Sequence, residues 1–148
     1  MSNRFSLGVR TTATAAGACW EIRTSANIRA RVVELGIFMA AATASTFGLG
    51  RPAAIGVTPT TPVDLLPNDF ADVTVAAQVQ SALAWGTAPT NPTGPNYLRR
   101  ISLSATIGVG VIWTWSDTAP LVIPVSSSIV VFNLATNGVA DMYIVLDE

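Results

Sequence analysis

The C-terminal stretch Val139-Ala-Asp-Met-Tyr-Ile-Val-Leu146 carries the clearest structural signal in the chain. Apolar residues recur at every second position, which is the period of a β-strand with one buried face. Asp141, Tyr143 and Asp147 fall between them and would face the other way. The pattern predicts a strand over 139–146. Its buried positions would be Ala140, Met142, Ile144 and Leu146.

Two more strands are predicted just before this one. Ile129–Leu134 is a short apolar run, and Asn137-Gly138 separates it from the last strand. Because Asn-Gly between two such runs is typical of a two-residue hairpin turn, we expect these two strands to pair. Pro120-Leu-Val-Ile-Pro124 predicts a strand at a sheet edge, since proline cannot donate to a central ladder.

The same alternation appears near the N-terminus. Ala18, Trp20 and Ile22 predict an apolar strand face, and Cys19, Glu21 and Arg23 between them predict a wetter face. Short β-branched runs separated by glycine, proline and asparagine continue along the chain, which favours eight or nine strands. We therefore predict an all-β fold, an antiparallel β-sandwich with jelly-roll-like connections, as a single domain over 17–148.

Four segments fit this pattern less well. Ala53–Asn68 and Gly86–Asn96 contain several prolines and predict long surface loops that reach a neighbouring molecule. Phe70–Trp85 is compatible with a strand or a helix, and its period-two valines favour the strand. Residues Met1–Ala16 predict an extended arm ordered on a neighbour, so that deletion of Met1–Val9 would weaken attachment without unfolding the domain.

The composition excludes most catalytic chemistry. The chain has no histidine, no lysine and one cysteine, Cys19, so neither a Ser–His–Asp triad nor a zinc site built from His or four Cys is available. Asp64, Asp69 and Asp72 are close in sequence but lack the spacing of a calcium loop, and turn or cap aspartates are the favoured interpretation. We expect no enzyme activity, no metal and no cofactor.

Charge is scarce in this protein. Of 148 residues, 50% are hydrophobic and 11% are charged, with a net charge of −1. An ordinary domain has about 25% charged residues, so we expect self-association or a place in a larger assembly. Eight arginines against nine acidic residues give no basic excess for nucleic acid. No run is long and apolar enough to predict a membrane span.

Arginine and the large aromatic residues are the candidates for an interface, where both are enriched. Trp113 and Trp115 share one face of a predicted strand. Packing in the core or an interface is the favoured role for this pair, and a platform that stacks sugar rings is the alternative. The candidate interface residues are Arg29, Arg31, Arg51, Trp85, Tyr97, Arg99, Arg100, Trp113 and Trp115.

Several segments, in this order, carry a family resemblance. They are Val33-Glu-Leu-Gly-Ile-Phe38, Ala41-Ala-Thr-Ala44, Leu49-Gly-Arg-Pro52, Tyr97-Leu-Arg-Arg100, Ile112-Trp-Thr-Trp115, Pro120-Leu-Val-Ile-Pro124 and Tyr143-Ile-Val-Leu-Asp-Glu148. Together they resemble small proteins encoded among the virion structural genes of tailed bacteriophages. The motifs are structural and transfer no functional residue.

The resemblance implies a virion component with a β-sandwich fold, made in the cytoplasm of the bacterial host. Its expected role is a head decoration or cement protein that binds the major capsid protein on the capsid surface, and its expected state is a homotrimer. A tail or neck accessory protein and a carbohydrate- or receptor-binding module on the virion are the alternatives. Glycan is the less expected partner.

Overall fold

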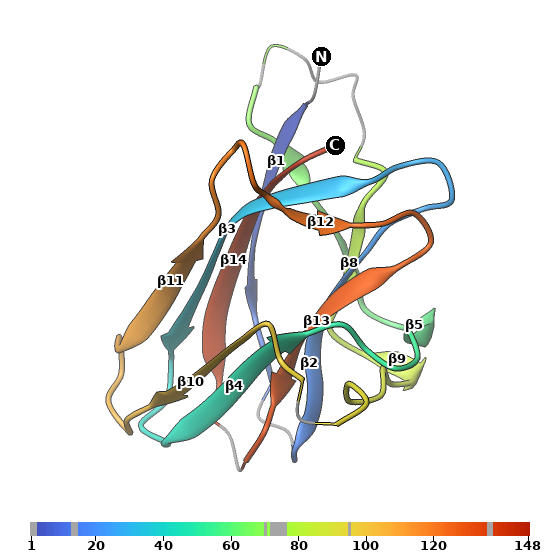
Figure 1. Cartoon of the computed structure of the whole chain (residues 1–148). Coiled ribbons are helices and arrows are strands. Elements are labelled where there is room, and N and C mark those ends of the chain that lie inside the picture. The colour runs from blue at the N-terminus through green and yellow to red at the C-terminus, as the bar shows by residue number, and fades with distance from the viewer. Residues whose placement is uncertain (1–2, 13–14, 70, 72–76, 95, 136–137) are drawn as a thin grey trace.

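The structure is a computed structural model, and it describes residues 3–12, 15–69, 71, 77–94, 96–135 and 138–148. Within these residues the chain forms strands and no helix, and every strand pair is antiparallel. Two six-stranded sheets pack together, with a small third sheet beside them (Figure 1). The predicted all-β, antiparallel two-layer architecture is confirmed, and the jelly-roll connectivity stays a prediction.

The first sheet has the order β11-β3-β14-β1-β7, and β12 pairs with β3 next to β11. Its central strand, β14, contains most of the predicted strand Val139–Leu146, and it alternates between buried and half-buried residues as predicted. The six strands are β1 (Arg4–Arg10), β3 (Ala30–Met39), β7 (Leu66–Pro67), β11 (Gly110–Thr114), β12 (Leu121–Ile123) and β14 (Ala140–Asp147).

The second sheet has the order β10-β4-β13-β2-β8-β6, and the third consists of β5 and β9. The strands of the second sheet are β2 (Gly17–Arg23), β4 (Ser45–Gly50), β6 (Pro62–Asp64), β8 (Gln80–Ala82), β10 (Arg99–Leu103) and β13 (Ser128–Asn133). The third sheet pairs β5 (Val57–Pro59) with β9 (Trp85–Thr87).

One hydrophobic core fills the space between the two large sheets. Phe5, Leu35 and Ile144 contribute from the first sheet, and Trp20 and Phe47 contribute from the second; all five are fully buried. Burial of one such side chain stabilises the fold by about 1.5–3 kcal/mol. The strand pattern of the sequence and the observed core therefore agree in the central strands.

The expected N-terminal arm is wrong over its described residues. Arg4–Arg10 form β1, which pairs with β14 along its whole length and with β7 at one end. Phe5 is fully buried and Leu7 nearly so. Because these side chains belong to the core, residues 4–10 are part of the domain and not an extension toward a neighbour.

The expected hairpin between the last two strands is also wrong. β13 pairs with β2 and β4, whereas β14 pairs with β1 and β3, so the chain crosses from one sheet to the other between them. Both strands already have a partner on each edge, which leaves no edge for mutual pairing. Asn137 of the expected turn lies outside the described residues, and the backbone N–H of Gly138 donates to Ser45 Oγ at 3.0 Å.

The proline-containing segments differ from the prediction in their role. Within Ala53–Asn68 the chain forms three short strands, β5, β6 and β7. Pro92 of the second segment lies over Gly50 of β4, and Gly56 of the first segment lies against Glu21 of β2. Both segments therefore pack within their own molecule, against the outer face of the second sheet and, through β7, at the edge of the first, whereas the prediction directed them toward a neighbour.

The question of strand or helix for Phe70–Trp85 falls partly outside the described residues. Phe70 and residues 72–76 belong to that part. Within the described part, Gln80–Ala82 form β8 and Trp85 begins β9. The predicted edge strand around Val122 is confirmed, because β12 pairs only with β3 among the described residues.

Candidate interaction surface

The outer face of the first sheet is open to solvent, in contrast to the covered second sheet. The strand register places its outward residues in rows across the sheet. One row runs from Ile112 of β11 through Gly36 of β3 and Tyr143 of β14 to Gly8 of β1. This row is apolar apart from one hydroxyl, and it occupies the middle of the face.

Two aromatic rings lie over glycines on this face. A Cβ atom on Gly36 would meet the Tyr143 ring at 2.1 Å, and one on Gly110 would meet the Phe38 ring at 2.4 Å. The two rings are nearly parallel, at 12°, with their centroids 6.4 Å apart. Each ring leans over the neighbouring strand in the direction of β11, which only glycine at that position permits.

A hydrogen bond also fixes the hydroxyl of Tyr143. It donates to Glu34 Oε1 at 2.5 Å. Burial, with a smaller contribution from the hydrogen bond and charge of Glu34, raises the pKa of Tyr143 to about 12. The ring is held at both ends, so this part of the surface is rigid before any partner arrives.

Gly8 lies uncovered beside these rings. It sits in the regular part of β1 opposite Tyr143, and no atom lies within 4 Å of the place where its Cβ would be. Two depressions, of about 400 and 370 Å³, meet at Gly8. Phe38 and Tyr143 line the first, and Leu66, which is 61% exposed, lines the second. The absent side chain thus makes a continuous hollow across the face.

Ion pairs border the hollow at the two ends of β1. At one end Arg10 donates to both carboxylate oxygens of Asp141, at 2.6 and 2.9 Å. The hydrogen bond from Arg10 lowers the pKa of the Asp141 carboxyl below its usual value. At the other end Arg4 donates to Asp147 at 2.7 and 3.0 Å, and this contact raises the pKa of the Arg4 guanidinium.

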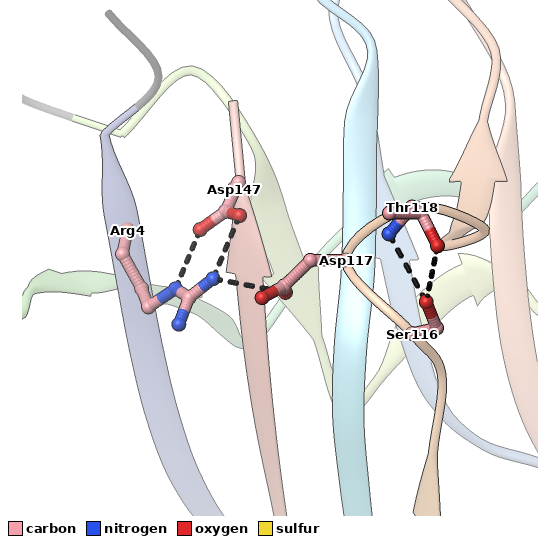
Figure 2. Close-up of polar contacts among 5 residues, drawn as sticks. All are labelled: Arg4, Ser116, Asp117, Thr118 and Asp147. Atoms are coloured by element: carbon pink, nitrogen blue, oxygen red, sulfur yellow. Dashed lines mark hydrogen bonds and ion pairs between the residues drawn. The ribbon is translucent and has the colours of Figure 1, made fainter.

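Figure 2 shows how a third acid reaches that second pair. Asp117 lies in the turn between β11 and β12 and approaches Arg4 at 3.4 Å. The turn is held by Ser116 Oγ, which contacts the Thr118 hydroxyl at 2.6 Å and accepts from the Thr118 backbone N–H at 3.1 Å. The face therefore combines an apolar middle with ion-paired side chains at its rim, as protein interfaces do.

Eight of the nine candidate interface residues predicted from sequence do not form this surface, and the ninth, Arg31 of β3, lies at its rim opposite Asp147. Tyr97 lies over Gly48 and meets Phe132 edge to face at 6.0 Å, and Trp85 donates to Glu21 at 2.7 Å. Both aromatic side chains therefore seal the second sheet of their own molecule.

Trp113 and Trp115 are half-buried and pack against the core. Alternation in β11 turns them inward and leaves Ile112 and Thr114 outside. Packing was the favoured role for this pair, and the structure shows it. An inward orientation leaves these two residues without the flat outward platform that sugar stacking needs.

The five arginines among the candidates are all exposed, and none makes an ion pair within the part of the chain that the structure describes. Arg99 lies over the Trp115 ring, with its guanidinium carbon 5.7 Å from the ring centroid, and Arg51 donates to the Val122 carbonyl at 3.1 Å. These contacts bring together Arg99 with Trp115 and Arg51 with β12. The five arginines do not form one site. They are Arg29, Arg31, Arg51, Arg99 and Arg100.

The remaining chemical candidates form no reactive site among the described residues. Asp69 accepts from the Ala71 backbone N–H at 2.9 Å, which is a turn contact, and Asp72 lies outside the described residues. No group of three potential metal ligands occurs in the described ranges. Cys19 is buried and free, and burial raises the pKa of its thiol to about 12, so the thiol stays protonated.

Phe38, Tyr143 and Gly8 are not among the interface residues predicted from sequence. The alternation of Val139–Leu146 did place Tyr143 outward, and a glycine within a strand marks a close approach by another group. Neither signal shows that β1 lies beside β14, which the register alone reveals.

No family model, no curated protein and no solved structure matches this chain. In the described residues no helix is long and apolar enough to cross a membrane.

Proposed function

We propose that this chain is a non-enzymatic structural protein of a tailed-bacteriophage virion, and that it decorates the capsid by binding the major capsid protein. The observation that carries the proposal is the difference between the two broad faces. The second sheet is sealed by the chain's own loops, whereas the first presents an apolar middle with a rim of paired charges. A protein that works by surface contact needs one such face.

The composition supports the same role. A protein with 11% charged residues and no histidine or lysine is suited to contact and poorly suited to proton-transfer chemistry. Symmetry repeats each contact many times on a capsid, so a modest single interface gives strong overall attachment. The proposed location is the capsid surface, after synthesis in the host cytoplasm, and the trimer that the resemblance implies is the proposed state on the capsid.

The test uses purified capsids of the phage that encodes the chain, stripped of or assembled without it. Wild-type protein is expected to sediment with these particles and to raise their thermal stability. Gly8→Leu places a Cβ where no atom lies within 4 Å and directs a bulky side chain into the hollow, so it is expected to lose binding. Thr87→Leu adds the same side chain at an exposed position of β9, over the second sheet, and is expected to bind normally.

Two results would overturn the proposal. One is the absence of wild-type protein from the sedimented capsids at saturating concentration. The other is equal binding by Gly8→Leu and Thr87→Leu, which would remove the first sheet from the contact. Electron microscopy of gold-labelled protein on whole virions separates a head position from a tail or neck position, and label on the tail alone would replace decoration by the accessory role.

A further inference from the structure

Most outer edges of the two large sheets carry features that hinder pairing with another strand. Natural proteins protect exposed edges with very short strands, prolines and charged side chains. Among the described residues, β7 has two residues and includes Pro67, β6 includes Pro62 and Asp64, β10 carries Arg99 and Arg100, and β12 lies between Pro120 and Pro124.

The edge strand β11 has none of these features. Residues 105–116 contain no charged side chain and no proline. Two apolar side chains in this segment are among the most exposed in the molecule, Ile107 at 67% and Ile112 at 51%. Figure 1 shows β11 at the margin of its sheet, with no further strand beyond it.

The main chain of β11 is directed so that another strand could pair with it. The Met39 N–H donates to the Val109 carbonyl, and the Trp115 N–H donates to the Val33 carbonyl, both at 2.8 Å. In an antiparallel pair, alternate residues direct both backbone groups to the same side. Odd-numbered residues of this segment therefore bond to β3, and Gly110, Ile112 and Thr114 direct their N–H and C=O groups away from the sheet.

We propose that β11 pairs antiparallel with β11 of a second copy of this chain, about a two-fold axis at Ile112. Such pairing joins the first sheets of the two molecules into one continuous sheet and places the two Ile112 side chains against each other on its outer face. It also satisfies the outward backbone groups of Gly110 and Thr114, each from the other copy.

Charge identifies the partner as a second copy. In a two-fold strand pair the residue on the axis faces the same residue of the other copy, so a charge there would face a like charge, which is destabilising. β11 carries no charged side chain, so two copies of it can pair without this repulsion wherever the axis lies. At β10 an axis at Arg99 or Arg100 would place that arginine against the same arginine of the other copy. A strand from a different protein would impose no such restriction.

This inference concerns the free protein and goes beyond capsid binding. A two-fold strand pair closes at two copies, whereas the trimer implied by the resemblance needs a head-to-tail contact. Light scattering after size exclusion separates the two, because the wild type is expected at twice the 15.4 kDa of one chain. A monomer at high concentration, or a trimer, would overturn the strand pair and would leave the capsid-binding test untouched.

Two substitutions at one residue test the contact. Ile112→Pro removes the outward N–H but none of the hydrogen bonds to β3, and it is expected to give a monomer with a wild-type circular dichroism spectrum. Ile112→Thr keeps both the N–H and a β-branched side chain, and it is expected to remain a dimer with a higher dissociation constant. A folded Ile112→Pro variant that still dimerises would contradict the proposal.

A charge exchange covers the case in which Ile112→Pro does not fold. Ile112→Glu and Ile112→Arg are each expected to be monomeric at low salt, because the introduced charges face each other across the axis. Mixed together, they are expected to form a heterodimer, which native mass spectrometry detects. Failure of the mixture to associate, while the wild type is dimeric, would place the contact elsewhere.

Discussion

The fully buried carboxylate of Glu21 accepts a hydrogen bond from the indole Nε1–H of Trp85 at 2.7 Å. Its other oxygen accepts from the Gly56 backbone N–H at 3.1 Å and from Ser128 Oγ at 2.8 Å. This carboxylate in β2 therefore holds Gly56 and Trp85, which lie in two separate segments, against the second sheet. It also links β2 to the neighbouring strand β13 through Ser128. This contact explains how that face is sealed while the first face stays open.

Replacement of Glu21 is expected to destabilise the fold. Glu21→Ala leaves three donors without their acceptor. A hydrogen bond to a charged group contributes about 1.5–3 kcal/mol to stability. We expect a decrease of about 2–4 kcal/mol in the free energy of unfolding, measured in urea. Trp85→Phe removes one of the three bonds and serves as the graded control, with a smaller loss. A change below about 0.5 kcal/mol in Glu21→Ala, the range of ordinary surface substitutions, would contradict this role.

Alanine at two glycines of the first sheet is expected to act in opposite directions. Gly36→Ala places a Cβ at 2.1 Å from the Tyr143 ring, so the ring must move, and overpacking of this kind costs about 1–3 kcal/mol. Gly8→Ala meets no atom and restricts the unfolded chain, so it is expected to leave the fold unchanged or to stabilise it by about 0.5–1 kcal/mol. Thermal unfolding measures both, and equal midpoints for the two variants would argue against the ring position.

Tyr143 is expected to make stability depend on pH in the alkaline range. Its pKa in the fold is about 12, compared with an ordinary value of 10.0. Because the unfolded chain loses this proton first, the stabilising contribution is complete below pH 10 and is lost as the pH rises from 10 to 12. The wild type is therefore expected to lose more stability than Tyr143→Phe across this interval. Parallel losses in urea titrations at pH 9, 10 and 11 would show that the phenol is not held in this way.

Deletion of Met1–Val9 is expected to prevent folding, contrary to the expectation from sequence alone. The deletion removes the central pairing partner of β14 and the buried Phe5 and Leu7 side chains, each of which contributes about 1.5–3 kcal/mol. Circular dichroism and a urea transition measure the result. Arg10→Ala, which changes only an exposed ion pair of the same strand, is the control and should fold. A shortened chain with a cooperative transition would restore the interpretation as an arm.

The local strand pattern of this protein follows from its sequence. Alternation in Val139–Leu146 identifies β14 and its buried side, and the prolines around Val122 identify an edge strand, because strand period and the missing proline N–H are local properties. The prediction failed for Glu21, which the alternation placed on a wetter face. Its burial depends on loops that are distant in sequence and fold over it.

The sequence alone determined the all-β class, the positions of the most regular strands, the absence of histidine and lysine chemistry and the shortage of charge, but it predicted eight or nine strands where the described residues form fourteen. Only the tertiary structure decided which strands are neighbours: β13 and β14 belong to different sheets, and β1 joins the middle of the first. Partner choice depends on contacts between residues far apart in the chain, and a periodic pattern contains no information about them. For the same reason Gly8, Phe38 and Tyr143 become one surface, and β11 an unprotected edge, only when the sheet is assembled.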